Sequence, residues 1–98
     1  MTDAEFQEFH EKKWAELPDD VKTKAVTFLR SQFSEELKED VRARIKADPI
    51  HWIGMEHFGW GMGVRNALRV EGGLRDNLLP SGNWDDYYIK AVEEAVGT

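Results

Sequence analysis

The segment EHFGWGMGVRNAL, residues 56–68, sets the fold that we expect, because it combines helical spacing with an unusual number of glycines. From Met55 onward, side chains recur at the intervals of three and four residues that mark one side of a helix: Phe58, Met62, Arg65, Asn66 and Arg69. The alternation with a period of two that marks a strand is poor. We therefore predict a helix from Met55 to the glycine pair at residues 72–73, with residues 50–53 as either its entry or its first turn.

The three glycines of this segment need a structural reason. Glycine inside a helix costs about 1 kcal/mol relative to alanine, so Gly59, Gly61 and Gly63 together oppose the helix by roughly 3 kcal/mol. Gly59 and Gly63 are four residues apart, so they would share one face as a notch flanked by Trp60 and Met62. Either another helix of the domain, or a ligand or partner, is expected to fill the notch, and Gly59→Leu should then cost about 1–3 kcal/mol by overpacking. An uncovered notch would predict a homo-oligomer.

Three helices are expected before this segment. Thr2 and Glu5 form a capping box for a first helix that ends at Pro18, where a second helix opens. Ser34 caps a third helix that continues to Lys46. Apolar residues at intervals of three and four support the three helices in turn: Phe6, Phe9, His10, Trp14 and Leu17; Val21, Ala25, Leu29 and Phe33; Leu37, Val41 and Ile45.

A last helix is expected after a loop over residues 75–82. Asn83 is a good N-cap, Gly97 follows the expected end, and an apolar row lies between them: Trp84, Tyr87 or Tyr88, Ala91 or Val92, and Ala95. Four Trp, five Phe and two Tyr supply the bulky side chains of a core. The sequence therefore predicts an all-α fold, a compact bundle of about five helices in which residues 1–98 form a single domain.

Charge and composition exclude several classes of function. The net charge is −6 and the isoelectric point is near 5.0, which argues against direct nucleic-acid binding. Residues 1–20 contain seven acidic and two basic side chains, a net charge of −5. There is no cysteine, no apolar run near the roughly 20 residues that span a bilayer, and no signal-peptide pattern in the first residues. We expect a cytoplasmic protein without a membrane partner.

Catalytic and metal-binding patterns are absent from the sequence. His51 and His57 are six residues apart, which places them on different sides of a helix, so neither joins Glu56 in a metal site of common spacing. The three serines lack a nucleophile elbow and an adjacent histidine. General acid–base work by Asp85, Asp86 or Glu93 stays open, but exposed helix carboxylates rarely catalyse. We expect no enzyme activity, metal or cofactor.

The pair Arg65-Asn66 has two interpretations. In the first, Arg65 forms a buried ion pair with Asp85, Asp86 or Glu56, and Asn66 binds a backbone group of the following loop. In the second, Arg65 holds a phosphate or carboxylate in a pocket while Trp60 or Trp52 stacks on a ring. The residues expected to contact such a ligand or partner are His57, Trp60, Arg65, Asn66 and Arg69.

The central segment resembles small, functionally uncharacterised domains of bacteria and their phages that carry a His-Phe-x-x-Gly-Met-x-x-Arg-Asn core on a helix. Residues 57–66 carry this pattern here, the likeness covers roughly residues 51–70, and a weaker likeness lies in residues 83–88. The resemblance implies a small helical domain with an origin in a phage or mobile element. It implies no particular activity.

Two functions are predicted from these observations. The first is a non-enzymatic interaction module, a phage-encoded inhibitor of a host defence system in the bacterial cytoplasm. Its acidic faces would bind a basic surface of a host protein through Glu5, Glu8, Glu11, Asp85 and Asp86. The alternative is a protein that binds or sequesters a nucleotide in a pocket around Arg65 and Trp60.

Overall fold

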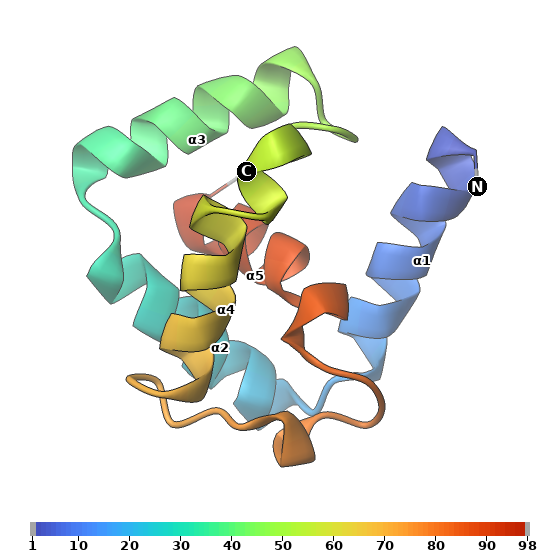
Figure 1. Cartoon of the computed structure of the whole chain (residues 1–98), viewed down its shortest axis with the longest axis vertical. Helices are drawn as coiled ribbons and strands as arrows, with labels where there is room; N and C mark the ends of the chain where they lie inside the picture. Colours follow the sequence, from blue (N-terminus) through green and yellow to red (C-terminus); the bar gives the residue numbers. More distant parts are fainter. Residues whose placement is uncertain (1, 98) are drawn as a thin grey trace.

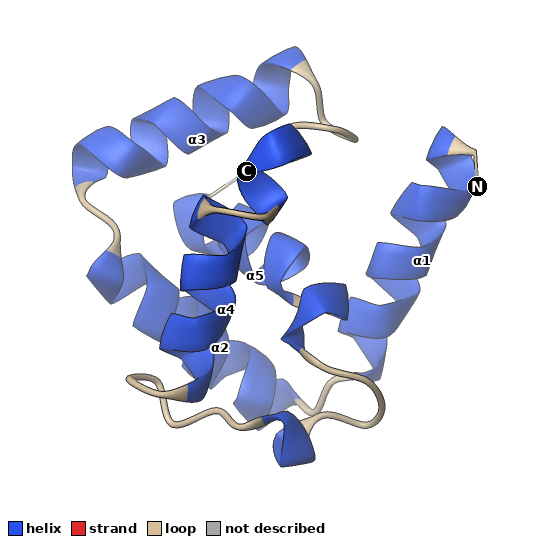
Figure 2. Ribbon diagram, viewed as in Figure 1, coloured by secondary structure: helices blue, strands red, loops and turns tan. Residues whose placement is uncertain are grey.

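Residues 2–97, apart from the Met55 side chain, are described by a computed structural model, and within them five α-helices are joined by turns and loops (Figures 1 and 2). The helices are α1 (Asp3–Glu16), α2 (Asp19–Gln32), α3 (Glu35–Ala47), α4 (Trp60–Arg69) and α5 (Tyr88–Val96). Three short 3₁₀ helices complete the pattern: η1 (Gly54–His57), η2 (Asp76–Leu78) and η3 (Trp84–Asp86). The predicted all-α fold is confirmed.

Local caps set the ends of the first helices, as the sequence predicts. The Thr2 hydroxyl accepts a hydrogen bond from the Glu5 amide at 3.2 Å, and the Ser34 hydroxyl accepts one from the Leu37 amide at 3.1 Å. Pro18 separates α1 from α2. The bounds of α1, α2 and α3 therefore agree with the prediction within one or two residues.

Helix α5 lies in the middle of the molecule, with the other four helices around it (Figure 1). Six of its nine residues are buried: Tyr88, Ile89, Ala91, Val92, Ala95 and Val96. A helix that is apolar on most sides is one that other elements cover. The core is thus built around α5 and not around the central segment, residues 56–68.

Two arginines hold the C-terminal end of α5. Arg42 on α3 donates from Nη1 to the Val96 carbonyl at 2.6 Å, and Arg30 on α2 donates from Nη2 to the Glu94 carbonyl at 3.2 Å. The last turn of a helix leaves carbonyls without amide partners further along the helix, although the Glu94 carbonyl also accepts from the Gly97 amide at 3.2 Å, and positive charge complements that end of the helix dipole. Arg42 therefore joins α3 to α5.

Aromatic side chains anchor the long connection between α4 and α5. Trp84 is fully buried, and its Nε1 donates to the Leu74 carbonyl at 2.7 Å. The Tyr87 hydroxyl donates to the Ser81 carbonyl at 2.9 Å. Asn83 caps η3 by accepting from the Asp85 amide at 2.8 Å, so the predicted cap is present but begins a 3₁₀ turn that precedes α5.

The central helix begins later than the sequence predicts. Gly54 has a positive φ of 47°, residues 54–57 form η1, and Gly59 is the N-cap of α4. Placing Gly54 and Gly59 outside the helix avoids the free energy that interior glycines would cost. Met55 through Phe58 therefore do not form the first turn of α4, which corrects the predicted boundary.

The predicted notch at Gly59 and Gly63 seats no neighbour, because no atom of the described chain lies within 4 Å of a Cβ placed at either glycine. The close approach is at Gly61 instead. A Cβ there would lie 2.6 Å from the Tyr88 hydroxyl oxygen and 3.2 Å from the Glu56 carbonyl oxygen. Contact between α4 and α5 thus requires glycine at position 61.

None of the helices in residues 2–97 has both the length and the apolar character that a membrane-spanning helix needs.

Candidate functional site

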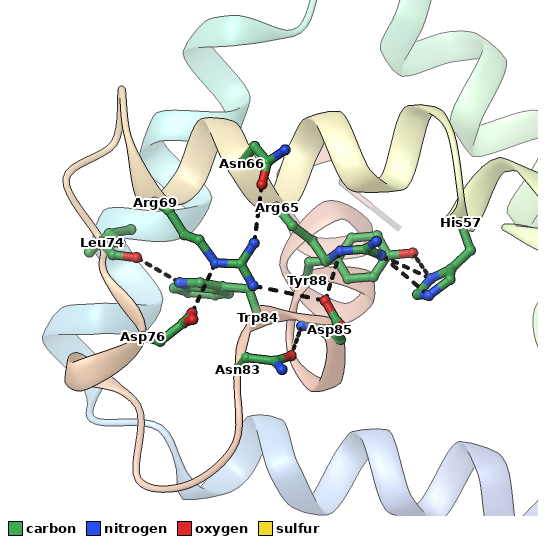
Figure 3. Close-up of polar contacts among 10 residues, drawn as sticks. All are labelled: His57, Arg65, Asn66, Arg69, Leu74, Asp76, Asn83, Trp84, Asp85 and Tyr88. Atoms are coloured by element: carbon green, nitrogen blue, oxygen red, sulfur yellow. Dashed lines mark hydrogen bonds and ion pairs between the residues drawn. The ribbon is translucent and has the colours of Figure 1, made fainter.

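Arg65 on α4 is the centre of a buried polar cluster (Figure 3). Only 5% of the residue is exposed, and its Nε lies 2.8 Å from Asp85 Oδ1. Its guanidinium carbon also lies 4.9 Å from the centre of the Tyr88 ring. Of the three acids proposed as counter-ions, the structure selects Asp85, whereas Glu56 faces Arg44 at 3.7 Å.

His57 completes this cluster as an acceptor. Its Nδ1 lies 2.6 Å from the Tyr88 hydroxyl and 3.0 Å from Arg65 Nη1. Arg65 Nη1 also lies 3.4 Å from His57 Nε2, and because a guanidinium only donates, the ring nitrogen that accepts from it must be unprotonated, so His57 is neutral. Burial, with the charge of Arg65 as the second cause, lowers the pKa of His57 in agreement with this state. Burial likewise raises the pKa of Tyr88 to about 12.

Asn66 and Arg69 extend the cluster toward the solvent. Arg69 Nε lies 3.0 Å from Asp76 Oδ1, its Nη2 lies 3.9 Å from Asp85 Oδ1, and its Nη1 donates to Asn66 Oδ1 at 3.2 Å. Asn66 is exposed and accepts from Arg69 through its side chain, not from a backbone group of the loop as predicted. Arg65 therefore forms a buried ion pair, whereas Asn66 makes a contact at the surface.

Trp60 does not join Arg65, although the sequence placed both in one pocket. The Trp60 ring lies 5.7 Å from the Phe33 ring and 6.5 Å from the Trp52 ring, measured between centres. It borders a shallow hollow of about 260 Å³ between α2, α3 and α4 that also includes Gly63. The predicted ligand-binding residues thus lie in two separate places.

A larger groove of about 470 Å³ opens between α1, residues 50–58 and the start of α5. We call it the α1 groove. Its apolar lining comes from all three segments: Phe6, Phe9, Ile50, Ile53, Phe58 and Ile89. Phe58 is 71% exposed and Phe9 is 37% exposed, so two large aromatic side chains of the lining are open to solvent. Apolar side chains of this size on a surface are typical of an interaction site.

Polar side chains form the remaining border of the α1 groove. All three histidines of the protein, His10, His51 and His57, line it together with Asp85 and Asp86. His10 is buried, and its Nδ1 lies 3.2 Å from the Asp86 carbonyl oxygen. Burial is the largest cause of the lowered pKa of His10. Within residues 2–97, no three His, Cys, Asp or Glu side chains are placed to hold a metal ion.

The acidic residues predicted to bind a partner are distributed unequally around this groove. Glu5 is exposed and precedes the groove residue Phe9 by one helical turn, outside the groove lining itself. Glu8 and Glu11 are exposed and share another face of α1. Asp85 and Asp86 lie on the opposite wall, and Asp85 is already paired with Arg65.

The α1 groove was missed by sequence reasoning because its walls are far apart in the chain. Phe6 and Phe9 belong to a predicted apolar stripe, and nothing in the spacing shows that Phe9 stays exposed. His57 and the acids Asp85 and Asp86 were named as site residues separately, and the fold brings these three together. Only Phe58, an aromatic side chain beside His57 in the central segment, gave a local signal.

Comparison of the chain with protein-family models, with curated proteins and with solved structures finds no match. The resemblance to bacterial and phage domains therefore stays a prediction.

Proposed function

We propose that this protein is a non-enzymatic interaction module that binds a basic region of a partner protein in the α1 groove. The observation that carries the proposal is the exposure of Phe58 and Phe9 in an apolar groove bordered by Asp85 and Asp86. A partner that covers these rings removes apolar surface from water, and the acids select a partner of positive charge.

The contacts of the polar cluster favour binding of a protein partner over catalysis or binding of a nucleotide. Arg65 is buried and directs its nitrogens to Asp85 and His57, so a phosphate would have to displace an internal ion pair. Trp60, the residue expected to stack on a base, lies against Phe33 instead. A protein partner requires neither rearrangement.

The resemblance of residues 57–66 to domains of bacteria and phages supports a more specific form of this proposal. The partner would be a bacterial host protein, and the module would inhibit it, as a phage-encoded inhibitor of a defence system acts in the host cytoplasm. This extension rests on the sequence likeness and on the acidic surface.

Matched apolar variants test the groove. Phe58 and Val70 are 71% and 70% exposed, but only Phe58 lines the groove. We expect Phe58→Ser to abolish capture of a partner from bacterial lysate that wild type and Val70→Ser retain, and we expect the purified partner to repeat this pattern in a direct titration. Equal binding by both variants would exclude the groove.

Charge variants test the acidic surface. Replacing Glu5, Glu8 and Glu11 with glutamine should weaken binding of the purified partner and flatten its dependence on salt, because fewer charges attract it. The matched control replaces three exposed acids elsewhere, Glu36, Glu39 and Glu71. If the two triple variants lose affinity equally, the effect is due to the net charge of the protein and not to Glu5, Glu8 and Glu11.

The nucleotide alternative has its own assay. A thermal-shift and tryptophan-fluorescence screen of nucleotides and cyclic dinucleotides should give no response if the protein binds only a protein partner. A nucleotide that raises the melting temperature of wild type and not that of Arg65→Ala would favour the alternative.

A further inference from the structure

We propose that the occupant of the α1 groove is an amphipathic helix of the partner, whose apolar side lies on Phe9 and Phe58 and whose lysine or arginine pairs with Asp86. This inference rests on the proposed function and specifies the chemistry of the partner. The inference rests on three features: a carboxylate without an ion pair, an apolar groove between helices, and nearby charge of the same sign as that carboxylate.

Of the two carboxylates that line the groove, only Asp86 has no ion pair within residues 2–97. Asp85, its neighbour in the chain, lies 2.8 Å from Arg65 Nε. Lys90, one turn after Asp86, lies 3.3 Å from Glu93 instead. Lys13, on the facing helix, donates to the Ser81 hydroxyl at 2.8 Å. Both nearby lysines are therefore directed to other partners.

The surroundings of Asp86 make an added cation favourable. The residue is half-buried, and its Oδ2 lies over Gly82, at 2.7 Å from a Cβ placed there. Its carbonyl oxygen faces the buried His10, whose lowered pKa keeps that imidazole neutral near pH 7 and so provides no compensating charge. A carboxylate partly shielded from water interacts more strongly with an incoming cation than a fully exposed one does.

A helix suits this groove better than an extended segment. Residues 2–97 contain no strand, so no sheet edge is present to pair with an extended peptide backbone. The apolar lining comes from α1 on one wall and from residues 50–58 and Ile89 on the other. An occupant with apolar residues at intervals of three and four presents one continuous side to such a groove, and its backbone groups bond one another.

Helix α1, opposite Asp86, carries charge of the same sign. Glu5 lies one turn before Phe9 on the exposed part of α1, where it accepts a hydrogen bond from the Thr2 hydroxyl at 3.0 Å. A further carboxylate thus lies on α1 one helical turn from the groove residue Phe9, outside the lining itself. We expect basic residues on the edges of the occupant helix, next to its apolar side.

Selection from a display library of random 14-residue peptides tests this inference with the full chain as bait. The enriched peptides should share apolar residues at helical spacing and a lysine or arginine at a fixed offset. Synthetic copies are then titrated by fluorescence anisotropy against wild type, Asp86→Asn, Phe58→Ser and two controls, Glu39→Gln and Val70→Ser. All variants are first checked for unchanged helical circular dichroism and melting temperature.

We expect Asp86→Asn to weaken peptide binding about tenfold at low salt and to reduce its salt dependence, whereas Glu39→Gln changes neither. Phe58→Ser should remove binding, and Val70→Ser should not. The charge swap gives a rescue: Asp86→Lys should bind a peptide whose basic residue is replaced by glutamate better than it binds the original peptide.

Three results would be decisive against the inference. Peptides that need Phe58 but bind Asp86→Asn as tightly as wild type would overturn the pairing with Asp86 and leave the proposed function standing. Enriched peptides without helical spacing would overturn the helical occupant. If no enriched peptide depends on Phe58, or if selection enriches nothing above an unrelated bait, both the inference and the proposed function fail.

Discussion

Among single residues, Arg65 links two elements of the fold, although burying its charge costs free energy. It joins α4 to η3 through Asp85 and supplies a donor to His57, while its own side chain is almost fully buried. A buried guanidinium is tolerable only because these acceptors replace the water it has lost. Asp85, by contrast, keeps about half of its side-chain exposure, so it remains hydrated if Arg65 is removed.

Arg65→Ala should destabilise the fold by about 2–3 kcal/mol, since it removes a charged hydrogen bond and the packing on Tyr88. Arg65→Lys should recover only part of this loss, because an ammonium cannot reach Asp85 and His57 in the same planar arrangement. Urea unfolding followed by tryptophan fluorescence measures both. An unchanged midpoint for Arg65→Ala would mean that Arg65 serves a partner and not the fold.

The two perturbed histidines predict how stability depends on pH. The pKa of His10 and the pKa of His57 both lie below the ordinary 6.5, chiefly because burial disfavours the charged ring. The unfolded chain therefore binds more protons than the folded chain near pH 6. The stability that the neutral histidines contribute is complete above about pH 6.5 and is lost as the pH falls through the folded pKa values.

We expect the midpoint of urea unfolding to decrease when the pH is lowered from 7.5 to 5.5. His57→Gln should make this fall shallower, because glutamine offers an acceptor to Tyr88 and Arg65 and does not titrate in this range. The measurement is a series of urea titrations at three pH values. A wild-type midpoint that is constant, or that rises as the pH falls, would contradict the assigned protonation state of His57.

At the scale of elements, the three glycines of the central segment have different roles. Gly61 lies against the hydroxyl of Tyr88, which is fully buried and bonded to His57, so neither side can move away easily. Gly63 lies inside α4 with open space beside it, and Gly59 precedes the helix with open space as well. Only Gly61 is required by packing.

Gly63→Ala should therefore stabilise the protein by about 0.5–1 kcal/mol, because alanine is the better helix former and meets no neighbour. Gly61→Ala should destabilise it by about 1–3 kcal/mol through overpacking. Thermal melting separates the two, since about 1 kcal/mol shifts the midpoint of a domain this small by roughly 4–8 °C. Gly59→Leu, which the sequence predicted to clash, should now have little effect. A melting temperature lowered equally by all three would show that α4 packs against something at its open side.

At the scale of the whole molecule, the same open side bears on self-association. Gly59 and Gly63 are uncovered, and Met62 and Val70 beside them are 46% and 70% exposed. The predicted homo-oligomer would use this side of α4. Light scattering across a concentration series should then show a mass that rises with concentration in wild type and stays monomeric in Met62→Glu. A monomer at every concentration would remove self-association and leave the apolar side chains as isolated surface residues.

The fold class and α1 to α3 could be predicted because their signals are local. Thr2, Ser34 and Pro18 act on amides within a few residues of themselves, so spacing alone locates the helix ends. The start of α4 could not be predicted in this way. Where α4 begins depends on the η1 turn before Gly59 and on the contact of Gly61 with Tyr88, and both belong to the tertiary fold.

The candidate site was predictable only in its parts. The sequence indicates that Arg65 needs an acidic counter-ion, and Asp85 is one of the three candidates. Which acid pairs with Arg65 depends on how η3 packs against α4. Phe9 and Phe58 are 49 positions apart, and no periodicity connects them. Their meeting in one groove is a property of the tertiary fold, as is the separation of Trp60 from Arg65.

The central position of α5 has a consequence for how the protein is made. The ribosome synthesises α1 to α4 before residues 88–96. The apolar sides of four amphipathic helices therefore stay uncovered until the segment that buries them has been made. Folding of this chain during synthesis can only be completed late, and a product interrupted before Trp84 should be recognised by chaperones and proteases as unfolded. Incomplete copies should therefore be removed before they accumulate.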